Sequence, residues 1–354
     1  MKLREFFLLA VAPVLISAAE PMAPSVVKSW SAPSTSSVLV EDKTFEREGV
    51  RLQGTLTLPQ NAKGAPAVVI FHGASSPLRN EALYDHLKRM LPPLGIAVFA
   101  YDRRGTGGSE GDAKGNAYDV LADDGIAAAQ MLARDPRIDS NRIGFWGLSQ
   151  GGWLSLLAAS RHKPTAFAIS VSAPMVTPDV QMNFAVANIL RIKGYSQSDI
   201  DLAVAARTAV DDFMRGRLDR PTAQARLDAA AAKPWFDLIY MSKSFKDSQE
   251  SGWAKEMRHD PLQSIGGVSA PALILYGAGD PWVPVATSME RLQDFTRDHA
   301  NFETAVVAGA DHAMATRRTP EQQIDPSQFP SQAPDSEEYF GRLAVWLQDH
   351  VLAK

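Results

Sequence analysis

The chain has 354 residues, no cysteine and a formal net charge of −4. Without cysteine it can form no disulfide, no thiolate metal site and no lipid-modified N-terminal cysteine. The small negative charge, with no local cluster of Lys and Arg, argues against nucleic acid as a partner. No apolar run has the length of a typical membrane helix, so we expect no membrane span in the mature form.

The N-terminus has the residue order of a secretory signal peptide. Lys2 and Arg4 precede an apolar run over residues 6–16, and small residues follow it. The pattern predicts a signal peptide over residues 1–19 and a poorly ordered Ser- and Pro-rich leader over residues 20–37. We therefore expect a periplasmic or secreted protein; the alternative is a buried N-terminal helix or an uncleaved anchor.

A hairpin and a buried strand open the folded part of the chain. Residues 38–58 alternate in polarity about a Glu-Gly turn, and residues 65–71 are a continuous apolar run, typical of a parallel strand buried on both faces. This strand leads into His72-Gly73-Ala74-Ser75, at the edge where open α/β sheets bind ligands. We expect the N–H of Ala74, or else that of Ser75, to stabilise negative charge on a substrate oxygen, and His72 to bond loop backbone.

A glycine-rich turn follows the next strand. A helix is predicted over residues 82–91, the strand over residues 96–101, and a second helix over residues 118–134. The turn, residues 102–109, is not followed by Lys-Ser/Thr and no helix starts at its glycines, so it is not a phosphate-binding loop. Asp102, Arg103 and Arg104 are expected to tie it to its neighbours by charge-assisted hydrogen bonds.

Gly147-Leu148-Ser149-Gln150-Gly151 lies between a predicted strand, residues 142–146, and a predicted helix, residues 153–160. In this context Gly-x-Ser-x-Gly is typical of a nucleophile elbow, a strained turn that lifts a serine out of the sheet. Ser149 is therefore the predicted nucleophile. The N–H of Gln150, at the start of the helix, is the other predicted oxyanion donor.

After a strand over residues 166–172 the pattern becomes helical until about residue 260. Helical segments are predicted at residues 180–192, 198–215, 222–233 and 235–241, with a short turn at 253–257. The length of this insertion predicts a helical cap over residues 177–260 that acts as a lid. Its aromatic residues either line an acyl pocket or pack within the cap. The predicted substrate-binding residues are Ser75, Trp153, Met175, Trp235, Phe236, Tyr240, Trp282 and Met314.

The strand pattern then returns, so residues 38–176 and 261–354 form the two parts of one core. Strands are predicted at residues 271–277 and 304–308, and helices at residues 289–297 and 336–351. Asp280 and His312 follow these strands as Ser149 follows its own, which brings three reactive side chains to one sheet edge. His312 would take the Ser149 proton while Asp280 holds the imidazole in the right tautomer. Asp311 is the alternative acid, although its place beside His312 in sequence makes a well-aligned bond awkward.

These motifs together resemble the α/β-hydrolase superfamily, over residues 45–351. The closer likeness is to its bacterial branch related to serine aminopeptidases, dipeptidyl-peptidase catalytic domains and acetyl xylan esterase-like enzymes. The segments that carry the resemblance are His72-Gly73, residues 102–109, residues 147–152, Gly279-Asp280 with Val283-Pro284, and Asp311-His312. It implies an α/β fold with a mostly parallel, doubly wound sheet and an inserted helical cap. Many relatives have a second glycine soon after His-Gly, whereas Ala74-Ser75-Ser76 follow here.

The predicted function is that of a secreted serine hydrolase, a carboxylesterase that cleaves small or medium acyl esters through an acyl-enzyme on Ser149. No metal and no organic cofactor are implied, and the partner is a small-molecule ester. A thioesterase or a serine exopeptidase is the alternative on the same three residues; for the exopeptidase, Asp211 and Asp212 would bind an amino terminus. A non-catalytic binding protein is the remote alternative. The acyl group, the alcohol and the oligomeric state are left open.

Overall fold

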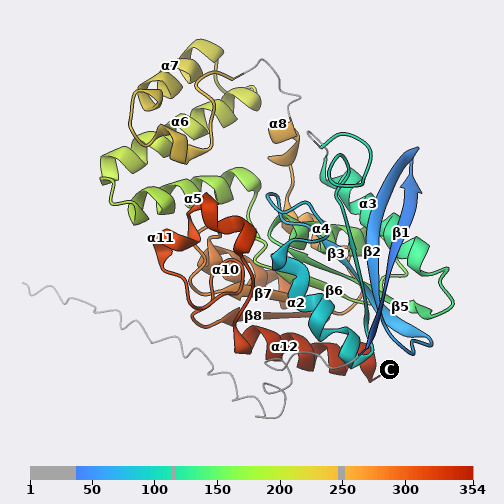
Figure 1. Ribbon diagram of the computed structural model, residues 1–354. Coiled ribbons are helices and arrows are strands. Elements are labelled where there is room, and N and C mark those ends of the chain that lie inside the picture. The colour runs from blue at the N-terminus through green and yellow to red at the C-terminus, as the bar shows by residue number, and fades with distance from the viewer. Residues whose placement is uncertain (1–36, 114–116, 246–251, 354) are drawn as a thin grey trace, which may run out of the picture.

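Eight strands form one sheet in the order β1-β2-β4-β3-β5-β6-β7-β8 in the computed structural model, which describes residues 37–113, 117–245 and 252–353 (Figure 1). The strands are β1 (Val38–Arg47), β2 (Val50–Pro59), β3 (Ala65–Phe71), β4 (Ala97–Tyr101), β5 (Ile138–Leu148), β6 (Ala168–Val171), β7 (Ala272–Gly277) and β8 (Phe302–Val307). The β1–β2 and β2–β4 pairs are antiparallel, and the strands from β4 through β8 run parallel. The predicted α/β-hydrolase sheet is thus confirmed, strand by strand.

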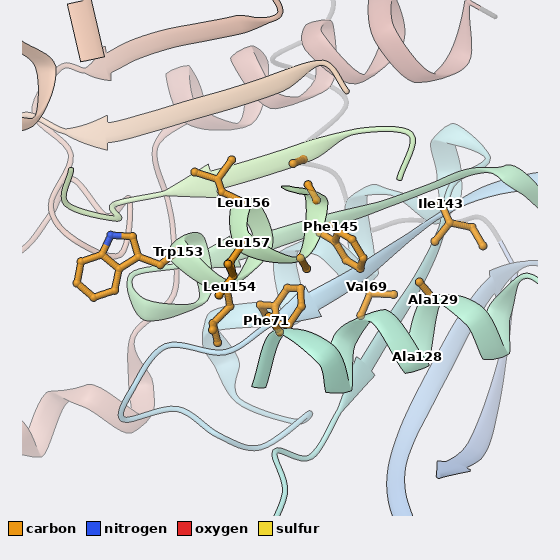
Figure 2. Packing of buried hydrophobic residues seen from close by; sticks show 14 of the residues in the cluster. Val69, Phe71, Ala128, Ala129, Ile143, Phe145, Trp153, Leu154, Leu156 and Leu157 are labelled. Carbon is orange, nitrogen blue, oxygen red and sulfur yellow. The ribbon is translucent and has the colours of Figure 1, made fainter. Parts of the chain in front are cut away.

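Helices cover both faces of the sheet because the central strands are apolar on both sides. One face packs on α3 (Tyr118–Leu132), α4 (Gln150–Arg161) and α10 (Val285–Thr296), and the other on α2 (Ala82–Met90) and α12 (Glu337–Leu347). Along β3, Val69 and Phe71 face the first group of helices (Figure 2). Ile70 faces the second group, as the two-residue period of a strand requires. Complete burial of a side chain such as Phe71 contributes about 1.5–3 kcal/mol.

Within the described residues of the predicted cap, 177–260, five helical segments lie between β6 and β7. They are α5 (Pro178–Ile192), α6 (Gln197–Met214), α7 (Arg220–Ala231), η2 (Phe236–Ile239) and α8 (Gly252–Glu256). Side-chain caps begin two of them: Ser196 accepts from the N–H of Asp199, and Asp219 from that of Thr222. The insertion has an apolar cluster of its own, to which α5, α6, α7 and η2 contribute. In Figure 1, α5 lies next to the sheet layer, and α6 and α7 stand farther out.

Several short elements differ from the predictions. The segment predicted as a helix at residues 235–241 is a single 3-10 turn. Besides the 3-10 helix η1 (Pro92–Leu94), three short helices in the described chain were not predicted: α9 (Pro261–Ile265), α11 (Pro320–Gln323) and η3 (Pro326–Ser331). Each of these three begins with proline after a side-chain cap, from Asp260, Thr319 and Asp325 respectively. They are too short to produce a helical hydrophobic period, so periodicity could not reveal them.

The N-terminal predictions fall outside this description. The predicted signal peptide, residues 1–19, and residues 20–36 of the predicted leader are not among the described residues. Across the part of the chain that is described, no helix combines the length and apolarity needed to cross a bilayer.

Candidate active site

Ser149 occupies the junction of β5 and α4 with an unusual backbone conformation. Its φ of 57° and ψ of −122° lie in a region that residues with a side chain rarely adopt, at a cost of about 1–3 kcal/mol. The surrounding structure holds this conformation: the N–H of Ser149 donates to the carbonyl of Val171 at 2.8 Å, and α4 starts at the next residue. The predicted elbow is therefore present, with its strain.

The glycines around Ser149 are required by close packing. A Cβ on Gly147 would overlap the backbone of Gly151, and a Cβ on Gly151 would overlap the carbonyl of Phe71 at the end of β3. A Cβ on Gly152 would lie 2.6 Å from the Oγ of Ser170, on β6. Helix α4 thus begins in contact with the ends of three strands, which only residues without a side chain permit.

Asp280 and His312 form a hydrogen-bonded pair. Nδ1 of His312 lies 2.7 Å from Oδ2 of Asp280, whose side chain has no exposed surface, whereas the His312 side chain keeps 18%. Oδ1 of Asp280 accepts the N–H groups of Trp282 at 2.8 Å and Val283 at 3.1 Å. Both carboxylate oxygens are engaged, so the carboxylate has a fixed orientation. Nδ1 is thereby committed to Asp280, which leaves Nε2 of His312 to exchange a proton with substrate groups.

The turn that carries Asp280 is also held from the insertion. Two amide side chains of α5 donate to its carbonyls, Gln181 Nε2 to Trp282 O at 2.8 Å and Asn188 Nδ2 to Pro281 O at 3.0 Å. The turn that carries Asp280 is therefore held by β7, by its own hydrogen bonds and by α5.

The charge of Asp280 governs the protonation of His312. Burial by itself lowers the pKa of His312, but the attraction of the Asp280 carboxylate and the hydrogen bond to it outweigh burial, with a further contribution from Asp311. The net effect raises the pKa of His312 above its ordinary value.

Asp311, the alternative acid, has a different role. Its Oδ1 accepts the N–H groups of Ala313 at 2.9 Å and Ala315 at 2.8 Å, so it closes the turn after β8. The structure pairs His312 with Asp280, as the sequence predicts.

Ser149 and the Asp280–His312 pair lie at the same edge of the sheet, because β5, β7 and β8 are parallel and each residue follows the carboxyl end of its strand. Within the described residues no hydrogen bond joins the Ser149 hydroxyl to the imidazole. In unliganded enzymes such bonds are often long and tighten when substrate binds.

Candidate oxyanion donors flank the serine. Ala74 and Ser75 are exposed after β3, and in the described chain neither N–H makes a hydrogen bond. The N–H of Gln150, at the first position of α4, is likewise without an acceptor there, as expected at a helix N-terminus. The structure thus offers two N–H groups after β3 and one at the helix start.

The structure confirms the structural contacts predicted for His72, Asp102, Arg103 and Arg104. The ring Nε2 of buried His72 bonds the carbonyl of Tyr101, and burial lowers the pKa of His72 to about 3, which keeps the ring neutral. Asp102 accepts the N–H groups of Arg79 at 3.0 Å and Gly108 at 2.9 Å. Arg104 pairs with buried Asp124, and Arg103 donates to backbone carbonyls of the loop after β3.

Several predicted substrate-binding residues belong to the core instead. Met175 and Met314 have no exposed surface and pack on the sheet. Trp153 is buried, donates from Nε1 to the carbonyl of Pro174 and packs on α3. Trp235 and Phe236 lie in the apolar cluster of the insertion. These five side chains pack against protein and offer no open surface, so a contact of theirs with substrate stays a prediction.

The remaining three predicted residues stay accessible. Ser75 is exposed, Tyr240 is 49% exposed, and Trp282 is partly exposed directly after the acid turn. The Trp282 ring lies between Tyr240, centroids 6.0 Å apart, and Phe329, 5.9 Å apart. Phe329 was not predicted, because its Pro-rich segment carries no pattern that points to the site.

Each carboxylate considered for an exopeptidase has one oxygen bound to a neighbouring side chain. Asp211 is 3% exposed and accepts from Trp253 Nε1 at 2.7 Å. Asp212 pairs with Arg217 at 2.7 Å. Neither is arranged as an open site for an amino terminus.

The family described as "Serine aminopeptidase, S33" matches residues 62–316, well over half of the chain. The chain belongs to this family. As a member of the serine aminopeptidase S33 family it is an α/β-hydrolase, consistent with its sheet order and its serine elbow.

Relatives of this S33 family member carry varied names. Polyketide transferase claH of Penicillium crustosum is 24% identical over 289 residues, covering 77% of this chain and 89% of that protein. Thiohydrolase aneE of Aspergillus aculeatus is 28% identical over 224 residues, covering 61% of this chain and 65% of its own length. The solved Pyrococcus furiosus esterase Pf2001 has a TM-score of 0.56 at 18% identity, covering 94% of this chain and 96% of that one, and so shows a shared fold.

Proposed function

We propose that the protein is a serine hydrolase that cleaves carboxylic esters through an acyl-enzyme on Ser149. The observation that carries the proposal is the oriented Asp280–His312 pair at the sheet edge that also bears Ser149 on its strained turn. A neutral hydroxyl is a poor nucleophile and needs such a base.

In the proposed reaction Nε2 of His312 accepts the Ser149 proton as Oγ attacks the substrate carbonyl. The N–H of Gln150 and that of Ala74 stabilise the oxyanion. Collapse of the intermediate expels the alcohol, which takes the proton from His312. Water, deprotonated by the same nitrogen, then attacks the acyl-enzyme and releases the acid, restoring the Ser149 hydroxyl.

Small or medium acyl esters are the proposed substrates, with Tyr240, Trp282 and Ser75 beside them. Thioester cleavage is the second candidate, favoured by the relatives named as a thiohydrolase and a polyketide transferase. Both candidates use the same acyl-enzyme and differ only in the leaving group. The exopeptidase alternative keeps the family description in its favour, but it lacks the amine site first expected at Asp211 and Asp212.

A substrate panel tests the proposal. p-Nitrophenyl acetate, butyrate and octanoate, an acyl thioester and aminoacyl-anilides would be compared on wild type, with Ser149→Ala as the blank. Ser160→Ala, on the same helix but with its hydroxyl bonded to Leu157 O at 2.8 Å, is the matched control. We expect ester or thioester turnover that Ser149→Ala abolishes, and a fluorophosphonate adduct on Ser149. Faster turnover of anilides, or undiminished activity of Ser149→Ala, would overturn it.

We also propose that the protein is exported, on the strength of the charged and then apolar residues at its start. Mass spectrometry of the N-terminus of protein recovered outside the cytoplasm is expected to begin at Glu20. An intact Met1 on that protein would contradict cleavage.

A further inference from the structure

The segment after β3 is a tight turn whose first and last residues, Gly73 and Ser76, are hydrogen-bonded to each other and to the protein around them. The N–H of Ser76 donates to the carbonyl of Gly73 at 3.3 Å, the i to i+3 bond of a β-turn. Ala74 and Ser75 are the two corner residues, and both are exposed. Their N–H groups, the candidate oxyanion donors, therefore take their direction from how the ends of the turn are fixed.

Tyr84 fixes both ends with one hydroxyl. Its Oη accepts the N–H of Gly73 at 2.9 Å and donates to the carbonyl of Ser76 at 2.7 Å. The side chain projects from α2, is completely buried, and packs edge-on against His72 and Trp146. Burial raises the pKa of Tyr84 well above its ordinary value, so the hydroxyl keeps the proton that it donates. The Tyr84 hydroxyl, carried on a rigid buried ring, thus binds both the first and the last residue of the turn.

Arg103 also binds the first part of this turn. Its Nη2 donates to the carbonyl of His72 at 2.9 Å and to that of Gly73 at 3.1 Å. Gly73 therefore has its N–H bound by Tyr84 and its carbonyl bound by Arg103 and Ser76. The peptide planes that flank Ala74 have little freedom to rotate while these bonds persist.

We propose that Tyr84 and Arg103 are positioning residues for the oxyanion hole. They orient the turn 73–76 so that its corner N–H points at the oxyanion that develops above Ser149. This inference rests on the proposed function, since an oxyanion forms only if Ser149 attacks a carbonyl. Neither side chain is required to touch substrate. Their removal is expected to weaken binding of the transition state and to leave binding of the ground-state ester nearly unchanged.

A second buried tyrosine gives a matched control. Tyr339, on α12, is also fully buried, and its hydroxyl bonds the ring of His86 at 3.0 Å. Tyr84→Phe and Tyr339→Phe each remove one buried, hydrogen-bonded hydroxyl, so a general loss of stability affects both alike. Only Tyr84→Phe loosens the turn after β3.

The test measures kcat and KM for p-nitrophenyl acetate, the affinity for a trifluoromethyl ketone analogue, and the melting temperature of both variants. For Tyr84→Phe we expect kcat to fall tenfold or more, KM to change less than about twofold, and the analogue to weaken in parallel with kcat/KM. Tyr339→Phe should keep kcat within about twofold. Equal losses in the two variants, or a Tyr84→Phe kcat within twofold of wild type, would overturn the inference.

The experiment also distinguishes failure of this inference from failure of the proposed function. If Tyr84→Phe does not fold, Arg103→Met loosens the same turn, because it removes the nitrogen Nη2 that donates both bonds to His72 and Gly73, and an unchanged kcat in that variant overturns the inference. Wild-type protein that neither hydrolyses the ester nor reacts with a fluorophosphonate at Ser149 overturns the proposed function, and this inference with it. An active wild type with an unaffected Tyr84→Phe overturns this inference alone.

Discussion

Replacing Asp280 by Asn changes the acid of the site while sparing the turn around it. The carboxylate uses Oδ1 for the N–H groups of Trp282 and Val283 and Oδ2 for Nδ1 of His312. An asparagine can keep the two backbone bonds through its amide oxygen. Its NH2 group then faces Nδ1 of His312, and because an amide nitrogen donates and does not accept, the imidazole must carry its proton on Nε2.

An imidazole protonated at Nε2 cannot take the proton of Ser149. We therefore expect kcat for p-nitrophenyl acetate to fall about 10⁴-fold, the loss that this change causes in a Ser-His-Asp triad. At 1.36 kcal/mol for each factor of ten, this is about 5 kcal/mol of lost transition-state stabilisation. The melting temperature should change little, because the turn keeps its backbone bonds.

Asp311→Asn is the control for this prediction. The Asp311 carboxylate also lies near His312 but bonds Ala313 and Ala315, so we expect its replacement to lower kcat less than about tenfold. The reasoning is refuted if Asp280→Asn keeps kcat within tenfold of wild type, or if Asp311→Asn loses as much activity as Asp280→Asn.

Three further results are expected. Ala74→Pro removes an N–H at a turn position that favours proline, so kcat should fall about 10²–10³-fold with the fold intact by circular dichroism; full activity would point to the Ser75 N–H as the donor. Gly151→Ala, whose Cβ would overlap β3, should lower the free energy of unfolding by about 1–3 kcal/mol, whereas Gly266→Ala, with its nearest neighbour at 3.6 Å, should not. Because neutral His312 is the proposed base and its pKa is raised, kcat/KM should climb with pH through a midpoint above about 6.5; a lower midpoint would contradict the proposed pair.

The sequence was sufficient to predict the sheet and the contact between Asp280 and His312, and the reason is physical. Parallel strands buried on both faces must be continuous apolar runs, and residues 65–71 and 271–277 show this directly. Such strands end at one edge, so a polar residue shortly after each of them is brought near the others whatever the intervening chain does. Asp280 and His312 meet for this reason, although 32 positions separate them.

Residues whose role depends on tertiary contacts could not be predicted in the same way. Trp235 and Tyr240 look alike in sequence, yet one is 1% exposed in the core of the insertion and the other is 49% exposed next to Trp282. Tyr84 appears only as an apolar position of a helix, because the two bonds of its hydroxyl are to backbone groups, which leave no trace in residue type. The partner of a side chain, unlike its burial, is set by the fold as a whole.

Gln181 and Asn188 of α5 bind the carbonyls of Trp282 and Pro281. These two bonds determine where a chimaera of this protein can be joined. A foreign specificity module spliced in before Pro178 would replace Gln181 and Asn188 and so release the acid from one of its supports. A graft that begins after Ile192 and ends before Pro261 would exchange α6, α7, η2 and α8 while leaving those two bonds and the core residues of α9 untouched. New substrate preferences are therefore best introduced in the outer helices, with α5 retained because it supports the turn that carries Asp280.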